Sequence, residues 1–149
     1  MPLDPSNYAI VVASDHAGLA LKEELIQPLG EFAKVVDLGT HDSESCDYPQ
    51  FAHAVARHVL EVDGTYGVLV CGTGVGMSIA ANRHRGVRAV VCSDEFSAAM
   101  ARRHNDANVL CLGARVVGFS LATSLCRAFL TTPFEGGRHQ RRVDQIEPA

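Results

Sequence analysis

The sequence predicts an α/β protein, a three-layer α/β/α sandwich around a five-stranded parallel sheet of the Rossmann-like kind. Short apolar runs alternate with amphipathic segments along the chain, which is the pattern of repeated strand–helix units. The runs are continuously apolar, as in residues 8–13 (YAIVVA) and 67–70 (GVLV), which is typical of strands buried on both faces. Because the connections are short, right-handed crossovers between parallel strands are expected.

Length and composition indicate a single domain over residues 1–149. The chain is 47% hydrophobic and 20% charged, a balance typical of a globular protein with a substantial core. No apolar run approaches the roughly 20 residues that a membrane span needs. The net charge of −4 argues against nucleic acid, so we expect neither a membrane nor a nucleic acid as partner. Residues 1–7 hold two prolines and no periodic pattern, and are expected to form a loose extension.

The cysteines and histidines bear on compartment and metal content. The five cysteines are an odd number without a C-x-x-C pair, and no secretion signal opens the sequence, so a reducing cytoplasm is expected. The seven histidines lack H-x-x-H or H-E-x-x-H spacing, so we expect no metal ion. No cofactor is expected either.

Two strand–helix units are expected in the first half of the chain. The strands cover 8–13 and 33–38, and the helices cover 19–29 and 49–62. Pro49 fits a first helical turn, because the N–H that it lacks would have no partner there.

Polar side chains follow the first strand and precede the second helix. Asp15 and His16 stand at the carboxyl end of a strand, where ligands gather in open α/β sheets. Asp15 could instead cap the next helix, but the adjacent histidine favours a polar binding site. Tyr48 either lines a pocket or acts as a hydrophobic staple, and its spacing leaves both open.

The stretch over residues 67–82 carries the strongest functional signal. A buried strand ends at Cys71, and Gly72, Gly74 and Gly76 follow at every second position before a helix begins. Alternating glycines let backbone N–H groups converge on an anion, and the positive end of the helix faces the same space. A thiol placed there should have a lowered pKa, which suits a base beside a developing oxyanion.

Two other interpretations of this stretch stay open. The dinucleotide fingerprint G-x-G-x-x-G fails by one residue, yet Asp94 or Glu95 lies about 20 positions on, where that fingerprint has its acidic residue. A P-loop is excluded because no Gly-Lys-Ser/Thr follows. Cys71 alone could also be a small buried residue of the core.

The second half of the chain continues the alternation. Strands are expected over 88–92 and 109–112, and helices over 95–103 and 118–130. The helix that begins at residue 95 is expected to turn Phe96, Ala99 and Met100 toward the core. His104 follows that helix, where it is either a partner of the helix dipole or a functional group.

The C-terminal tail is rich in arginine, with a helix expected from about residue 138. If helical, Arg138 shares a face with Arg142 and lies near Arg141. Such guanidinium groups match phosphate oxygens in charge and shape. The alternative is a solvated terminal helix, and the flanking glycines and histidine leave both open.

Together these motifs resemble a known family, the type B ribose-5-phosphate isomerases, which also includes allose-6-phosphate isomerase and the subunits of galactose-6-phosphate isomerase. The resemblance covers nearly the whole chain in the family's order. Its pieces are residues 14–18 (SDHAG), 47–49 (DYP), 71–82 (CGTGVG to AN), 104–106 (HND), 113–115 (GAR) and 135–142 (EGGRH to R). Each piece alone is a weak signal, whereas six in register are a strong one.

The resemblance implies a metal-free aldose–ketose isomerisation that interconverts ribose 5-phosphate and ribulose 5-phosphate, in the non-oxidative branch of the pentose phosphate pathway. Cys71 would be the base that moves a proton between C2 and C1 through a cis-enediolate, with Thr73 in support. His104, assisted by Asp15, would open the sugar ring. Some members use a glutamate base at the position of Met77, so this chain resembles the cysteine type.

The same resemblance implies the binding residues. Those that would contact the substrate are Asp15, His16, Tyr48, Gly72, Gly74, Val75, Gly76 and Asn105. Those that would hold its phosphate are His16, Arg115, Arg138 and Arg142, with Arg141 as the rival of Arg142.

Family members are dimers or larger, with each pocket completed by the neighbouring subunit. We therefore expect a homodimer or a dimer of dimers whose C-terminal arginines act across the interface. Two alternatives stay open for the function. One is a six-carbon substrate such as allose 6-phosphate, which pocket depth decides, and the other is a non-catalytic nucleotide or sugar-phosphate binding module.

Overall fold

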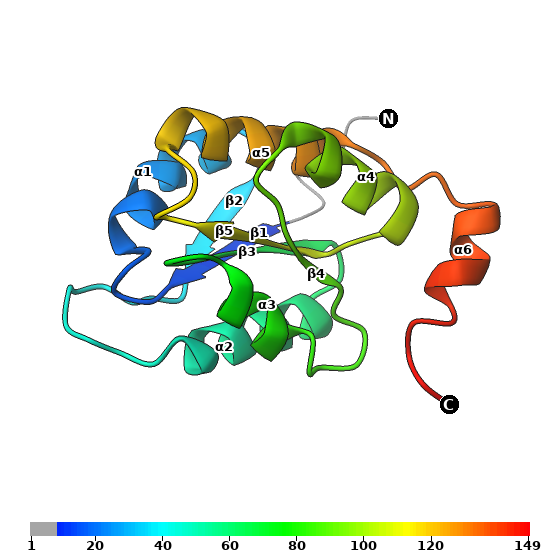
Figure 1. The fold of residues 1–149 in the computed structure, drawn as a ribbon, viewed down its shortest axis with the longest axis horizontal. Helices are drawn as coiled ribbons and strands as arrows, with labels where there is room; N and C mark the ends of the chain where they lie inside the picture. Colours follow the sequence, from blue (N-terminus) through cyan, green and yellow to red (C-terminus); the bar gives the residue numbers. More distant parts are fainter. Residues whose placement is uncertain (1–8) are drawn as a thin grey trace.

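A computed structural model describes residues 9–149 as five strands and six helices (Figure 1). The elements are β1 (Ala9–Ser14), α1 (Leu19–Gly30), β2 (Lys34–Asp37), α2 (Tyr48–Glu61), β3 (Thr65–Cys71), α3 (Val75–Ala81), β4 (Ala89–Val91), α4 (Glu95–Asn105), β5 (Val109–Gly113), α5 (Phe119–Thr131) and α6 (Arg138–Val143). Every strand pairing is parallel, and the order across the sheet is β2-β1-β3-β5-β4. The predicted α/β architecture with a five-stranded parallel sheet is confirmed. The expected extension over residues 1–7 lies outside the described residues.

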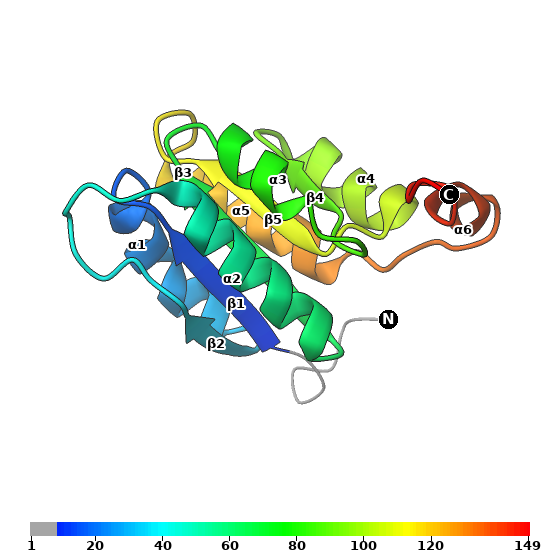
Figure 2. The same cartoon turned by 90° about the horizontal axis from the view of Figure 1, so that it is seen from below.

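Helices cover both faces of the sheet, with α1, α4 and α5 on one side and α2 and α3 on the other (Figures 1 and 2). Ile10 and Val12 of β1 pack into the core on the α1 side, whereas Val11 and Ala13 pack into the core on the α2 side. Successive strand residues point to opposite faces, so each run has to be continuously apolar. This explains why the apolar runs located the strands.

The inward face of α4 differs from the prediction. Phe96 is 74% exposed, and the buried residues of the helix are Ala98, Ala101 and Arg102. Small alanines let α4 pack closely against its neighbours, and the Arg102 guanidinium donates to Asp106 Oδ1 at 2.8 Å and to the Tyr66 hydroxyl at 3.0 Å. The expectation that Phe96 faces the core is therefore wrong.

The tail ends in a short helix that stands apart from the sheet (Figure 1). This helix, α6, packs against α4, and the segment leading to it is fixed by the Glu135 N–H, which donates to the Arg103 carbonyl at 3.0 Å. No helix of the described residues is long and apolar enough to cross a membrane.

In a parallel sheet the carboxyl ends of the strands lie along one edge and their amino ends along the opposite edge, and these two edges have different chemistry here. Because all strands point the same way, Ser14, Cys71 and Gly113 end at one edge, with Ser14 paired to Val70 and Cys71 paired to Gly113. The helix α4 leaves this edge and ends at Asn105, beside the start of β5 at the opposite edge. The predicted site residues divide between these two edges.

Candidate active site

Cys71 is the last residue of the central strand β3, and its sulfur has a polar partner. The Gly74 N–H donates to Cys71 Sγ at 3.1 Å, and the side chain is only 5% exposed. Gly74 adopts φ +82°, and an added Cβ would lie 3.0 Å from the backbone of Leu112, so the turn requires glycine there. Cys71 is thus both buried among core residues and hydrogen-bonded, in a position that places a backbone amide on the thiol.

The glycine turn leads directly into α3. Thr73 is exposed, and its Oγ1 accepts from the Val75 N–H at 3.3 Å. Gly74 is the residue before the helix, so the N–H groups of Val75 and Gly76 belong to the first turn, which a helix leaves without internal partners. These amides and the thiol face the same edge of the sheet.

Asp15 lies on the neighbouring strand end and is buried. Its N–H donates to the Val70 carbonyl at 3.3 Å, and its Oδ1 accepts from the Gly18 N–H at 3.0 Å. Gly18 is the N-cap of α1, so the carboxylate closes the turn before the helix and does not cap its first turn. An added Cβ at Gly18 would overlap the Val70 carbonyl, so this turn lies directly against β3.

Tyr48 is the first residue of α2, and its ring covers the glycine turn. An added Cβ on Gly76 would lie 2.6 Å from Tyr48 Cζ, so only glycine lets the ring approach this closely. A hydrophobic staple residue precedes the N-cap, whereas Tyr48 follows the N-cap Asp47. The hydrophobic-staple alternative is therefore wrong, and the Tyr48 ring lies against the glycine turn.

Two basic side chains lie at the rim of this edge. The Arg115 N–H donates to the Gly72 carbonyl at 3.0 Å, and its guanidinium lies 3.5 Å from the position of a Cβ on Gly72. His16 is exposed, and its Nδ1 accepts from the Cys46 N–H at 3.2 Å. The structure thus brings Asp15, His16, Tyr48, the turn from Cys71 to Gly76 and Arg115 to one edge.

The other predicted residues lie at the opposite edge within the same chain. His104 and Asn105 form the end of α4, and Arg138 and Arg142 lie exposed on α6. A helix rises 1.5 Å per residue, so the eleven residues of α4 carry His104 roughly 15 Å from the edge that holds Cys71. A single chain does not bring these four side chains to the thiol.

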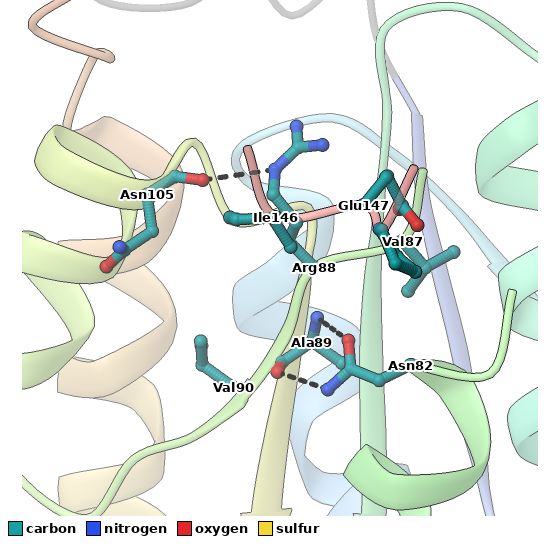
Figure 3. Close-up of a pocket in the computed structure, with 9 residues that line it drawn as sticks. Asn82, Val87, Arg88, Ala89, Val90, Asn105, Ile146 and Glu147 are labelled. Carbon is teal, nitrogen blue, oxygen red and sulfur yellow. Dashed lines mark hydrogen bonds between the residues drawn. The ribbon is translucent and has the colours of Figure 1, made fainter. Parts of the chain in front are cut away.

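Asn105 lines a cavity of about 370 Å³ at this second edge (Figure 3). The Arg88 Nε donates to the Asn105 carbonyl at 3.0 Å. The Asn82 side chain makes two hydrogen bonds to the edge strand β4. Its amide nitrogen donates to the Ala89 carbonyl at 2.9 Å, and its Oδ1 accepts from the Ala89 N–H at 2.7 Å. The Asn82 side chain therefore has a structural role. The cavity is lined by Asn82, Val87, Arg88, Ala89, Val90, Asn105, Ile146, Glu147 and Pro148.

His104 stacks on a second histidine that sequence reasoning did not single out. The rings of His104 and His139 are 4.2 Å apart between centroids, with an interplanar angle of 12°. His139 Nε2 lies 3.8 Å from Glu135 Oε1. Burial, followed by the charge of nearby His104, lowers the pKa of His139. The signal in the sequence is a glutamate four residues before the histidine of the arginine-rich tail.

Lys22 is a second residue that sequence reasoning missed. It is 1% exposed, and its Nζ lies 2.8 Å from Asp37 Oδ1 and also donates to the Thr40 carbonyl. The ion pair joins α1 to the end of β2, where the loop toward Tyr48 begins. A lone lysine beside the apolar positions of a predicted helix was the available signal.

The fold belongs to the class of open parallel α/β proteins, in which ligands bind at the carboxyl ends of the strands, and the Cys71 thiol and the glycine turn lie at that edge. A family model described as Ribose/Galactose Isomerase matches residues 10–146. The chain belongs to the ribose/galactose isomerase family. The resemblance seen in the sequence is thereby confirmed.

Relatives and solved structures support the assignment. The chain is 52% identical over 140 residues to ribose-5-phosphate isomerase B of Escherichia coli K12, covering 92% of this chain and 93% of that protein. The structure of a ribose 5-phosphate isomerase from Thermotoga maritima matches with TM-score 0.89 and 48% identity, covering 95% and 98% of the two chains. The Mycoplasma genitalium ribose-5-phosphate isomerase B with bound ribulose 5-phosphate matches with TM-score 0.89 and 46% identity, covering 93% of each chain.

Proposed function

We propose that this chain is an aldose–ketose isomerase that interconverts ribose 5-phosphate and ribulose 5-phosphate. The observation that carries the proposal is the Cys71 thiol, whose sulfur accepts a hydrogen bond from the Gly74 N–H at the start of a glycine turn. The names of the E. coli and T. maritima relatives, and the ribulose 5-phosphate bound to the M. genitalium protein, support this substrate.

In the proposed mechanism Cys71 is the base that moves a proton between C2 and C1 through a cis-enediolate. The Gly74 N–H donates to the sulfur and fixes its position for the proton transfer. Positioned base catalysis contributes about 10²–10⁴-fold. The first-turn amides of α3 stabilise the enediolate oxygen, and each such donor is worth about 10²–10³-fold. Thr73 orients this turn through its bond to Val75.

Ring opening and phosphate binding use residues at the carboxyl edge of the sheet together with residues on α4 and α6. His104, assisted by Asp15, transfers the protons that open the ring, and Asn105 and Tyr48 contact the sugar. Four basic side chains hold the phosphate: His16, Arg115, Arg138 and Arg142. Arg141 neighbours Arg142 on α6 and is its rival.

We further propose that the site residues at the carboxyl edge of one chain meet those on α4 and α6 of another chain across a subunit interface, in a homodimer or a dimer of dimers. The separation of His104 from Cys71 in one chain supports this, because the reaction needs both at one sugar. Apolar side chains are exposed on α3, β4 and α4: Ile79 at 62%, Val91 at 41% and Phe96 at 74%. Such exposed apolar side chains fit an interface between copies of a chain.

A reducing compartment, the cytoplasm, is also proposed. All five cysteines are unpaired, and persistent disulfides belong to oxidising compartments.

The test is a proton NMR time course of ribose 5-phosphate in D₂O without added metal or cofactor. The wild-type protein should form ribulose 5-phosphate with deuterium entering at the transferred carbon. Cys71→Ala should lower kcat by at least about a hundredfold and still bind inorganic phosphate. The matched control is Cys92→Ala, which removes a buried thiol just after the edge strand β4 and should retain turnover.

The outcomes separate the candidate functions. Turnover of allose 6-phosphate instead of ribose 5-phosphate would favour the six-carbon alternative. Phosphate binding without turnover of either sugar, unchanged in Cys71→Ala, would favour the non-catalytic binding module.

A further inference from the structure

A cluster of two histidines and a glutamate lies between α4 and α6. We infer that His104, Glu135 and His139 form a binding site for a transition-metal dication of the Zn²⁺ class, and that the bound ion inhibits turnover by occupying a His104 nitrogen. The binding site stands on the structure alone. The inhibition rests on the proposed function, in which His104 transfers protons during ring opening.

The distances suit a zinc ion once the His104 ring has rotated out of its stack on His139. One ligand atom from each residue lies within 4.8 Å of the others, and His139 Nε2 lies 3.8 Å from Glu135 Oε1. Ligands at zinc distances of about 2.0–2.1 Å in a tetrahedron are about 3.4 Å apart. The Glu135 and His139 pair is therefore almost in place, whereas His104 has to rotate its ring and bring a nitrogen closer by roughly 1 Å or slightly more.

His139 has a buried nitrogen that points to a missing ligand. The side chain is 6% exposed, and its Nε2 has no hydrogen-bond partner among the described residues. The 3.8 Å to Glu135 is too long for a hydrogen bond. Buried polar atoms are normally satisfied, and a metal ion between this nitrogen and the carboxylate would satisfy both.

The backbone holds the three residues together without the ion. The Glu135 N–H donates to the carbonyl of Arg103, the residue before His104, at 3.0 Å. The His139 N–H donates to the Gly136 carbonyl at 3.1 Å, and Gly136 and Gly137 take positive φ of 69° and 57° to turn the chain into α6. Ligand residues from two helices and the connecting segment are thus positioned in advance.

The surroundings set the expected strength and geometry of binding. A metal ion lies in the plane of each imidazole that it binds, so the nearly parallel rings must leave their stack. His104 is partly exposed at the end of α4 and can rotate. Arg138 and Arg142 disfavour a cation, and three protein ligands leave a position for water. We expect micromolar affinity, with Zn²⁺ or Co²⁺ preferred over Mg²⁺ because two ligands are imidazoles.

Direct binding tests the site. Isothermal titration with ZnCl₂ and the visible spectrum with CoCl₂ are measured on the wild type, Glu135→Gln and His139→Asn, in buffer without phosphate. Loss of either ligand should weaken zinc binding at least about tenfold and remove the tetrahedral cobalt bands. Glu135 is half exposed, so Glu135→Gln is expected to leave the fold intact even if His139→Asn does not.

The matched control is His84→Asn, which breaks the chain's other histidine pair, His53 and His84, whose nitrogens are 2.7 Å apart. This variant should bind zinc as the wild type does. Equal affinity in Glu135→Gln and the wild type, or loss of binding in His84→Asn, would overturn the site.

Turnover of ribose 5-phosphate at increasing ZnCl₂ tests the inhibition. Glu135→Gln should be as active as the wild type without zinc and should need at least about tenfold more zinc for half inhibition. Zinc that binds at this cluster without slowing turnover would overturn the inhibition and leave the site. A wild type that is inactive without zinc would overturn the proposed function, and the binding data would still decide the site.

Discussion

At the scale of single residues, the surroundings of the sulfur distinguish Cys71 from three other cysteines. Burial raises the pKa of Cys92 to about 11 and that of Cys126 to about 12, and it raises the pKa of Cys111 further. Those thiols are apolar core atoms at neutral pH. The Cys71 sulfur instead accepts a backbone N–H at the open edge of the sheet.

These raised pKa values predict a loss of stability in alkali. The folded chain keeps the three thiols neutral, whereas the unfolded chain releases their protons near the ordinary thiol pKa of 9.0. The free energy of unfolding should therefore be constant with respect to these groups below pH 9 and fall as the pH rises beyond it. Urea titrations between about pH 7.5 and 10.5 measure this.

Cys126→Ala serves as the control for alkaline unfolding. It is less stable at every pH because a buried group is lost, but its stability should fall less steeply above pH 9 than that of the wild type. Identical slopes in the two proteins would mean that Cys126 does not contribute to the pH dependence.

Among the elements, α1 and β2 are joined by the buried Lys22. Removing one member of a buried ion pair leaves the other uncompensated, and Asp37 is 28% exposed, which lets water compensate part of the loss. Lys22→Ala should therefore lower the free energy of unfolding by about 3 kcal/mol in urea titrations. It should also loosen the loop that leads from Thr40 to Tyr48.

Lys34→Ala is the matched control for Lys22→Ala. Lys34 is the other lysine of the chain, lies exposed at the start of β2, and should change stability by less than about 0.5 kcal/mol. An equal loss in the free energy of unfolding in both variants would show that the ion pair with Asp37 does not contribute to stability.

The elements themselves were largely predictable, because a parallel sheet covered on both faces requires continuous apolar strands. The helix at residues 95–105 shows where this reasoning ends. Its hydrophobic content favoured an inward Phe96, but Ala98 and Ala101 are the buried apolar residues, and Arg102 is buried with its terminal nitrogens donating to Asp106 and Tyr66. The hydrophobicity of a sequence does not indicate how much space is available between helices.

For the whole molecule, the division of the site residues predicts complementation between inactive subunits. In a dimer mixed from Cys71→Ala and His104→Asn chains, one site receives both intact residues and the other receives neither. Random mixing makes half of the dimers heterodimers, so about a quarter of wild-type activity should return. The proteins are mixed, unfolded and refolded together, and turnover is measured.

Each variant refolded alone is the control, and it should stay inactive. A mixture as inactive as its components would contradict a site shared between subunits, and it would require His104 to act elsewhere. Size-exclusion chromatography of the same samples reports whether dimers form.

Sequence reasoning proposed most residues of the candidate site but did not predict their positions relative to one another. The turn after Cys71 follows from local glycine spacing, so it was visible in the sequence. The distance between Cys71 and His104 depends on the course of α4 across the sheet, and the approach of His139 to His104 depends on how α6 docks. Such contacts between distant segments have no local signature.

The two hydrogen bonds between Asn82 and Ala89 also affect how copies of this chain can associate. An unpaired strand edge is a template on which another chain can add a strand. Here a side-chain amide already occupies both the N–H and the carbonyl of Ala89, in a strand only three residues long. The N–H and carbonyl of Ala89 therefore cannot pair with a strand of another chain, which disfavours extension of the sheet at β4 when copies associate.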